Sequence, residues 1–295
     1  MTLAAFLIAV FVLGNNFVAV RFSNAELEPF WGAASRFAAA SLVLFVVVAA
    51  RRIPLPRGRA LVGAALFGVL GFYLSYALMY WGMQWVPAGV TSAIVATVPI
   101  STLFIAAAVG LERITAMRLL GGSVAAVGIA VLFSEQLTVD LPVFALLAVA
   151  LASVCISGSG VAVKFYPRSH PFATNAVATG IGALLLGATS LAAGEAWILP
   201  SREPTWIAWT WLVFSTVVGF VLTVWVLSRW TASAVGYSTV LMPIVAVTGG
   251  SLLASEPITL ALVAGAAIVV AGVYVGALRR SPAPQAPPEP VPART

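Results

Sequence analysis

Long apolar segments alternate with short polar ones along almost the whole chain. Apolar runs bounded by charge, proline and glycine lie near residues 2–20, 29–50, 59–82, 89–110, 117–133, 141–166, 172–193, 206–228, 233–254 and 259–278. Each is close to the roughly 20 apolar residues that a helix needs to cross a bilayer. The pattern therefore predicts an all-α integral membrane protein with ten transmembrane helices and no additional soluble domain.

The composition supports this class. Of the 295 residues, 61% are hydrophobic and only 8% are charged, whereas soluble chains contain roughly a quarter charged residues. This excludes soluble enzymes, DNA-binding proteins and disordered chains. The net charge of +6 comes from arginines beside apolar spans, so no nucleic acid partner is expected. One cysteine, Cys155, excludes an internal disulfide and a multi-Cys metal site, and we expect no cofactor.

The distribution of Lys and Arg predicts the orientation. With a cytoplasmic N-terminus, twelve of these residues lie inside, two lie outside, and Arg36 lies within a span. Positive residues favour the cytoplasmic side, so both termini should be cytoplasmic in a multi-pass plasma-membrane protein. The first span lacks the basic segment of a cleavable signal peptide and should remain in the mature protein. Residues 281–295 contain six prolines and predict a disordered tail, either inert or partner-binding.

Two halves of the chain match at a constant separation of 144 residues. The matched pairs are Trp81 and Trp225, Ala88 and Ala232, Pro99 and Pro243, Ile100 and Ile244, Glu112 and Glu256, Thr115 and Thr259, Gly121 and Gly265, and Gly128 and Gly272. We infer a five-span repeat at 1–136 and a second at 137–280. Five is odd, so the second copy is inverted. Inverted repeats are typical of secondary transporters, with the substrate site near the midplane.

The segment Gly14-Asn15-Asn16-Phe17-Val18-Ala19-Val20-Arg21 resembles the first-helix motif of the drug/metabolite transporter superfamily, in its EamA-type ten-helix branch. Pro29, Arg36 and the duplicated segments from Pro99 to Glu112 and from Pro243 to Glu256 are similar to other positions of that pattern. The resemblance covers residues 1–280, and the YddG-like aromatic amino-acid exporters are the most similar branch. It implies ten helices around a central cavity, a bacterial inner-membrane location, and export of amino acids or other small metabolites. Arg21 departs from the pattern, because many members have Lys there.

An aromatic face on the third span is the first candidate for a cavity wall. Phe72, Tyr76, Tyr80 and Met83 recur every three or four residues and therefore share one helix face. Such a wall suits a zwitterion with an apolar side chain. Packing against neighbouring helices explains the same pattern equally well.

Polar residues in the spans are the second group of candidates, because a polar side chain at the midplane needs a hydrogen-bond partner. They could bind a substrate's carboxylate and ammonium, or bond to a neighbouring helix. The full candidate substrate-binding set is Asn15, Asn16, Phe72, Tyr76, Tyr80, Thr91, Ser153, Ser157, Thr223, Tyr237 and Ser238.

Three further features concern conformational change and energy coupling. Pro99 and Pro243 lie near the middles of the fourth and ninth spans, where they should bend the helix as hinges or as static kinks. Gly121, Gly128, Gly265 and Gly272 should let the fifth and tenth spans pack closely. No Asp or Glu lies in the middle of a span, and Glu112 and Glu256 lie at span ends, where capping or pairing with Arg explains them. A facilitator is therefore favoured over a proton antiporter.

We therefore predict a monomeric secondary transporter, not an enzyme, that exports neutral amino acids, aromatic and other apolar ones included, by alternating access. Its partners are the small-molecule substrate and the lipid bilayer. A multidrug cation exporter would need a glutamate in the first span, and a nucleotide-sugar exchanger would need several cations in the cavity. A lipid flippase or a membrane protein without transport activity remains an alternative.

Overall fold

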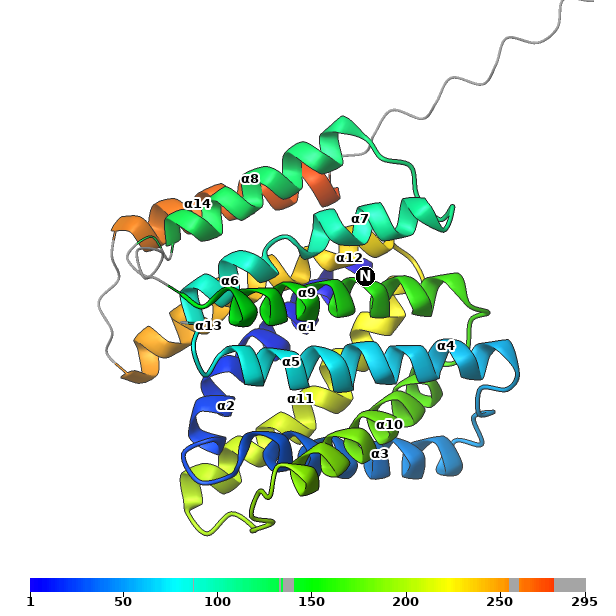
Figure 1. The fold of residues 1–295 in the computed structure, drawn as a ribbon. Coiled ribbons are helices and arrows are strands. Elements are labelled where there is room, and N and C mark those ends of the chain that lie inside the picture. Colours follow the sequence, from blue (N-terminus) through cyan, green and yellow to red (C-terminus); the bar gives the residue numbers. More distant parts are fainter. Residues whose placement is uncertain (87, 133, 135–140, 255–259, 279–295) are drawn as a thin grey trace, which may run out of the picture.

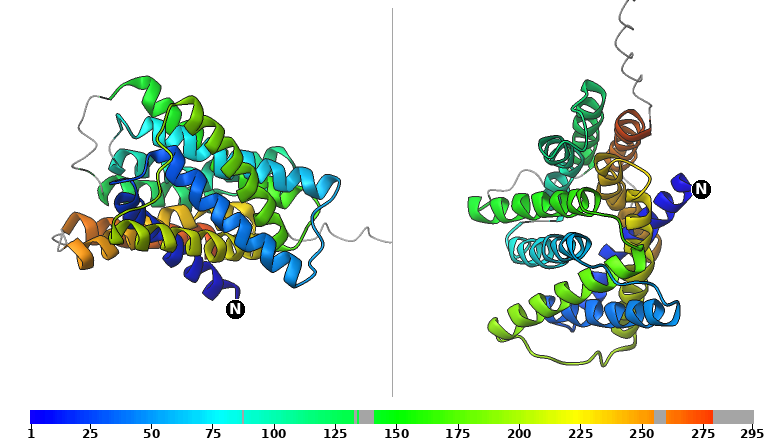
Figure 2. Two further views of the ribbon diagram at one scale, coloured as in Figure 1. Left: turned by 90° about the horizontal axis from the view of Figure 1, so that it is seen from below. Right: turned by 90° about the vertical axis from the view of Figure 1, so that its right-hand side faces the viewer.

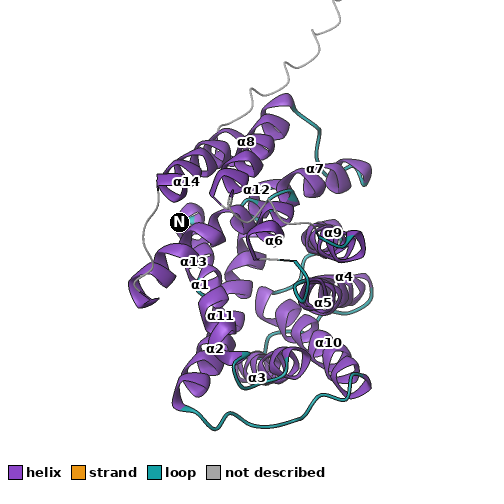
Figure 3. Ribbon diagram, turned by 60° about the vertical axis from the view of Figure 1, so that its left-hand side comes forward, coloured by secondary structure: helices purple, strands orange, loops and turns teal. Residues whose placement is uncertain are grey.

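The computed structural model describes residues 1–86, 88–132, 134, 141–254 and 260–278. In this part of the chain all regular structure is helical (Figures 1 and 3). The first half contains α1 (Thr2–Gly14), α2 (Asn16–Ser23), α3 (Pro29–Ala50), α4 (Arg59–Phe67), the π-helix η1 (Gly68–Leu74), α5 (Ser75–Gly82), α6 (Ala88–Val95), α7 (Val98–Ala108) and α8 (Ala116–Leu132). The second half contains α9 (Val143–Phe165), α10 (Pro171–Ala192), α11 (Glu203–Leu227), α12 (Ala232–Gly236), α13 (Ser238–Ala254), α14 (Leu260–Val273) and the π-helix η3 (Tyr274–Leu278).

These elements form the ten predicted passes, which confirms the fold class. Five continuous helices are long and apolar enough to cross a membrane: Pro29–Ala50, Arg59–Gly82, Val143–Phe165, Pro171–Ala192 and Glu203–Leu227. The remaining passes consist of shorter apolar helices, some of them two in succession. Glu256 and Thr259, which the 144-residue offset pairs with Glu112 and Thr115, lie outside the described residues, as does the Pro-rich segment 281–295.

Several helices begin at a proline, which explains part of the segmentation. Pro29, Pro99 and Pro171 occupy the first turns of α3, α7 and α10. A proline costs little there, because the first N–H groups of a helix have no intrahelical partner. Before Pro29 and Pro171 a polar segment ends one pass, and the proline lies in the first turn of the next.

Five of the described passes are not regular α-helices throughout. The first is divided at Asn15, the third contains η1, the fourth is divided just before α7, the ninth is divided at Tyr237, and the tenth ends in η3. Pro99 therefore lies in the first turn of the helix that follows an interruption. Pro243 lies inside α13, six residues after the interruption at Tyr237. The division of the ninth pass thus lies apart from Pro243.

Two pairs of counterpart helices pack together at opposite sides of the bundle. Figures 1 and 2 show α8 beside α14 on one side and α3 beside α10 on the other. Under the 144-residue offset, Gly121 in α8 corresponds to Gly265 in α14, and Arg36 in α3 corresponds to Gly180 in α10. Packing of each helix against its own counterpart is the arrangement expected around a pseudo-twofold axis.

The α8–α14 contact is made through glycines, which confirms the predicted close packing. A Cβ atom added at Gly128 would lie 2.7 Å from the Val269 nitrogen and 2.9 Å from the Gly265 oxygen. A Cβ at Gly272 would lie 2.7 Å from the Gly121 oxygen. The backbones of α8 and α14 are in contact at these positions, so a residue larger than glycine would push the two helices apart.

Candidate functional site

A cavity of about 280 Å³ opens at one end of the bundle, between α4, α9, α10 and α11. Its wall combines small or apolar residues such as Gly63, Ala64 and Val224 with the hydroxyls of Ser169, Thr174 and Ser228. Small-molecule pockets begin at roughly 300 Å³. At about 280 Å³ this cavity lies just below that range.

The charged residues of the cavity wall are all cationic: Lys164, Arg168 and Arg229. Lys164 Nζ donates to the Leu227 carbonyl at 3.0 Å and to the Trp230 carbonyl, which joins the ends of α9 and α11. The Arg229 guanidinium lies 3.6 Å from the centre of the Trp225 ring. The mouth of the cavity is therefore positive and attracts anionic groups.

Behind this cavity lies an aromatic cluster, which we define as Phe37, Phe67, Phe72, Tyr76, Tyr80 and Phe220. Phe72 is fully buried, and its ring centre lies 4.7 Å from that of Phe220 and 5.1 Å from that of Phe37. The ring centre of Tyr76 lies 5.0 Å from that of Phe37 and 5.9 Å from that of Tyr80. Val224, in the cavity wall, packs in the same hydrophobic core. The three predicted aromatic residues are thus brought together, beyond the inner end of the cavity.

Glycines and a π-helix let the cluster pack this tightly. A Cβ added at Gly182 in α10 would lie 2.4 Å from the Phe72 Cβ, and one at Gly68 would lie 2.7 Å from the Ala178 oxygen. Phe72 and Gly68 belong to η1. Single π segments inside α-helices occur frequently at functional sites.

Arg36 borders the aromatic cluster from α3. Only 2% of its surface is exposed, and its guanidinium carbon lies 4.8 Å from the centre of the Phe37 ring and 5.3 Å from that of Tyr76. Its Nε has no hydrogen-bond partner. Within the described residues, no carboxylate forms an ion pair with it.

The predicted hydroxyl residues on α9 and α11 bond within the protein. Ser153 donates to the Val149 carbonyl at 3.0 Å and Thr223 to the Gly219 carbonyl at 2.8 Å. Ser157 donates to the Ser153 carbonyl and lies 2.7 Å from the Ser101 hydroxyl of α7. In this conformation these groups stabilise helices and the α7–α9 contact, which is the alternative role that the sequence left open.

Three predicted polar residues lie in or near the first and fourth passes. The Asn15 amide donates to the Phe11 carbonyl at 2.8 Å at the point where α1 ends. Asn16 Oδ1 and Thr91 Oγ1 are buried without a partner. An unpaired buried oxygen is costly, so these two atoms are available to a bound group.

Tyr237 and Ser238 lie at the interruption of the ninth pass. Tyr237 is buried between α8 and η3, and its hydroxyl donates to the Arg118 carbonyl at 3.1 Å. Ser238 is buried at the start of α13. The preceding Gly236 packs against Pro99, with a Cβ added there at 3.4 Å from the Pro99 Cα. The two interrupted passes thus meet at their interruptions, while no hydrogen bond in the described part of the chain joins Tyr237 to the aromatic cluster.

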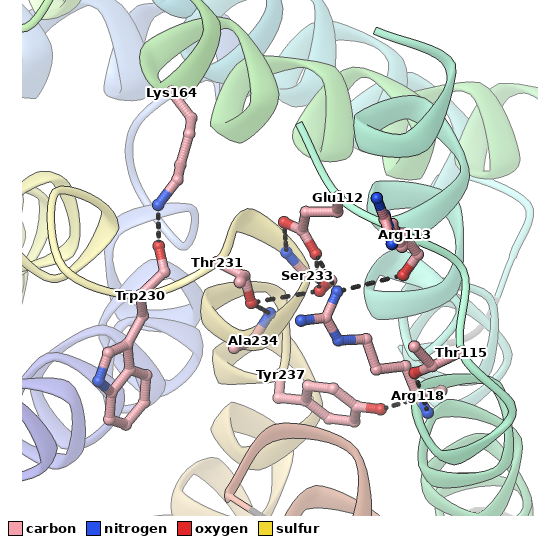
Figure 4. A network of polar contacts seen from close by, with 10 residues as sticks. All are labelled: Glu112, Arg113, Thr115, Arg118, Lys164, Trp230, Thr231, Ser233, Ala234 and Tyr237. Carbon is pink, nitrogen blue, oxygen red and sulfur yellow. Dashed lines mark hydrogen bonds and ion pairs between the residues drawn. The ribbon is translucent and has the colours of Figure 1, made fainter. Parts of the chain in front are cut away.

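A carboxylate, Glu112, connects α12 to the α7–α8 connection (Figure 4). It accepts from Arg118 Nη1 at 2.9 Å, from the Ser233 nitrogen at 3.1 Å and from the Ser233 hydroxyl. Ser233 lies in the first turn of α12, where the helix dipole favours a negative charge. The predicted role of Glu112, capping and pairing with Arg, is confirmed.

At the other end of the bundle, the α10–α11 loop contacts the α2–α3 loop and the start of α3. The Glu195 carboxylate accepts from the Phe30 and Trp31 nitrogens at 3.1 and 2.8 Å, and the Trp31 ring stacks on Trp197 with centres 4.3 Å apart. Glu26 accepts from the hydroxyl and nitrogen of Ser201 and from the Arg202 nitrogen. These bonds, led by the Ser201 hydroxyl, lower the pKa of Glu26 from 4.5 to about 2.

The candidate set omitted Arg36 and the cationic cavity mouth. The sequence contains a signal for Arg36, since every other Lys or Arg falls in a loop, in the C-terminal tail or near the end of a predicted span. The distribution of Lys and Arg between the two sides of the membrane treats Lys164 and Arg229 as cytoplasmic loop residues. These two residues and Arg168 line the same cavity because α9 packs against α11. The sequence of one span alone does not predict this packing.

Comparison with known proteins gives consistent results. The model of the family described as EamA-like transporter family matches residues 1–134 and 143–277. An uncharacterized transporter of Archaeoglobus fulgidus is 26% identical over 287 residues, covering 90% of this chain and 95% of that protein. The uncharacterized transporter YoaV of Bacillus subtilis is 26% identical over 272 residues, covering 90% and 92%.

Two further similarities concern part of the sequence and the fold. A probable terminal-alkyne amino-acid exporter of Streptantibioticus cattleyicolor is 35% identical over 98 residues, which is 33% of each chain. A solved crystal structure aligns with a TM-score of 0.81 at 18% identity, covering 94% of this chain and 96% of that one. At that identity the alignment concerns the fold alone.

Proposed function

This chain belongs to the EamA-like transporter family, and from that premise we propose that it exports neutral amino acids, aromatic and other apolar ones included, and related small metabolites. The main support is the aromatic cluster directly behind the cavity. A zwitterion that enters the cavity can place its apolar side chain against Phe72, Tyr76 and Phe220, whose ring contacts bury apolar surface. The partial match to a probable amino-acid exporter is consistent with this class.

The two ends of the bundle support alternating access. The cavity opens at one end, and we propose that the contacts of Glu195, Glu26 and the Trp31–Trp197 stack close the other. In the orientation predicted by the distribution of Lys and Arg, the open end faces the cytoplasm. Export then begins with a substrate that enters from the cytoplasm, and release requires the contacts at the closed end to separate.

We further propose a plasma-membrane location with both termini in the cytoplasm, and function as a monomer. The proposed substrate-binding set comprises the aromatic cluster and the buried oxygens of Asn16 and Thr91, which have no partner. Ser153, Ser157 and Thr223 would join it only by exchanging their present bonds for bonds to the substrate. The interruptions at Pro99 and Tyr237 are the proposed hinges.

Transport by the purified protein in liposomes tests this function. Phenylalanine, leucine and threonine should be carried, and nucleotide sugars and quaternary cations should not. Beyond the cationic cavity mouth, Arg36 is the one buried cation among the described residues, and no described carboxylate lies in the aromatic cluster to pair with a cation. Transport of nucleotide sugars or quaternary cations without any amino acid would refute the proposal.

The variant Tyr76→Ala tests the role of the cluster. Loss of an aromatic contact of about 0.5–1.5 kcal/mol should reduce phenylalanine transport about two- to tenfold and threonine transport less. Tyr274→Ala is the matched control, because Tyr274 is 60% exposed on η3. Equal losses for both amino acids in Tyr76→Ala would show that the tyrosine has a structural role only.

A further inference from the structure

The charge of Arg36 is not compensated by any described carboxylate. The residue is the eighth of α3, a helix of 22 residues that is long enough to span the membrane. Removing an ion from water costs several kcal/mol even after relaxation, so buried charges are normally paired. The positive-inside rule explains cations in loops and does not explain one at this depth.

The rings beside Arg36 compensate its charge only in part. The guanidinium lies within 6 Å of the ring centres of Phe37 and Tyr76, at 4.8 and 5.3 Å. Cation–π contacts contribute about 0.5–2 kcal/mol each. They act on the face of the guanidinium, whereas its N–H donors lie in its plane, where the Tyr76 hydroxyl oxygen is an acceptor for this group. The Nε–H has no acceptor.

The ring contacts lead from the cavity to Arg36. Val224 lines the cavity and packs in the same core as the aromatic cluster. From there Phe220 contacts Phe72, Phe72 contacts Phe37, and Phe37 lies under the guanidinium. A substrate that passes the Phe72–Phe220 contact therefore next meets Arg36.

We propose that Arg36 binds the carboxylate of the transported substrate once the substrate has passed the Phe72–Phe220 contact. The guanidinium presents parallel donors that match a carboxylate in a bidentate pair. This rests on the proposed function and narrows it: the recognised class is small carboxylates with an apolar side chain, and the same molecules without the carboxylate are poor substrates. The aromatic rings then hold the side chain beside the bound carboxylate.

The experiment compares analogues in proteoliposomes that contain the full-length protein. Phenylalanine, phenylalanine amide and phenylethylamine differ at the carboxylate, whereas phenylpyruvate keeps the carboxylate and lacks the ammonium group. Wild-type protein should carry phenylalanine at least about tenfold better than its amide, since hydrogen bonds to charged groups contribute about 1.5–3 kcal/mol. In Arg36→Gln, the ratio of the phenylalanine transport rate to the phenylalanine amide transport rate should fall to near one. Arg51→Gln, which removes an exposed arginine at the end of the same helix, should leave it unchanged.

The outcomes separate this inference from the proposed function. Equal transport of acid and amide by the wild type, or an unchanged ratio in Arg36→Gln, would overturn the inference even if amino acids are carried. Transport of phenylpyruvate without phenylalanine would refute amino-acid export and support recognition of a carboxylate.

A second variant applies if Arg36→Gln fails to fold. Arg36→Lys keeps the charge and loses the bidentate geometry, so KM for phenylalanine should rise while KM for the amide stays constant. An equal change in both KM values would indicate a structural role for Arg36 and overturn the inference.

Discussion

Single hydroxyl groups show how a membrane protein satisfies polar residues locally. Ser153 and Thr223 each donate to the carbonyl four residues earlier in their own helix. This bond removes the cost of a polar group in an apolar environment. A hydroxyl in a span is therefore weak evidence for a binding site, while a buried atom without a partner, such as Asn16 Oδ1, is stronger evidence.

Glu26 provides a prediction for the dependence of stability on pH. Its pKa in the folded protein is about 2, against 4.5 for a free glutamate, so the folded state favours the charged form. The stabilisation is complete above pH 4.5 and is lost as the pH falls toward 2. The difference in melting temperature between wild type and Glu26→Gln should therefore shrink as the pH is lowered from neutral to about 3.

Glu28 is the matched control for this measurement. It is an exposed carboxylate in the same loop. Glu28→Gln should therefore have the same melting temperature as the wild type, both at neutral pH and at about pH 3. A constant difference between wild type and Glu26→Gln across the range would show that the charge of Glu26 does not stabilise the loop contact.

The sequence predicted the aromatic residues better than the polar ones, for a physical reason. Phe72, Tyr76 and Tyr80 follow the helical period, so their common face is a local property of one segment. The partners of Ser157 and Tyr237 are Ser101 and the Arg118 carbonyl, which belong to distant helices. Whether these two side chains are satisfied depends on how the helices pack, and the periodicity of one span does not contain that information.

At the level of helices, the α8–α14 contact gives a sharp prediction for stability. Gly128→Ala should destabilise the protein by about 1–3 kcal/mol, because the added Cβ would overlap the backbone of α14. Gly160→Ala in α9 is the control, since a Cβ there meets nothing within 4 Å. Thermal unfolding of both variants in detergent tests this. An equal effect of the two substitutions would contradict glycine-mediated packing.

The two prolines should differ in their effect on transport. Pro99 begins α7 after an interruption, so Pro99→Ala lets an added N–H join α6 and α7 into one helix. Pro243 lies inside α13, so Pro243→Ala adds one bond to an existing helix. We expect several-fold slower transport for Pro99→Ala with normal membrane insertion, and a smaller effect for Pro243→Ala. Wild-type rates in Pro99→Ala would assign the interruption a static role.

At the scale of the whole molecule, the ten passes followed from hydrophobicity and the repeat followed from a constant offset. The positions of the interruptions did not follow, because the two halves diverge there: the counterpart of the π-helix η1 lies in the regular helix α11. The open cavity at one end also depends on which conformation the transporter adopts. A sequence that is compatible with two conformations does not specify either one alone.

The orientation of the bundle is the last prediction, and it decides the direction of transport through the cavity. In the predicted topology, twelve Lys and Arg residues fall on one side and two on the other, and the three cations of the cavity mouth belong to the richer side. The positive-inside rule therefore places the open cavity in the cytoplasm. On a Cys155-free background, an impermeant thiol reagent added outside should label a Cys at Asp140 and leave a Cys at Arg57 unmodified. The reverse pattern would place the cavity outside, and this conformation would then be the one that takes up substrate from the exterior.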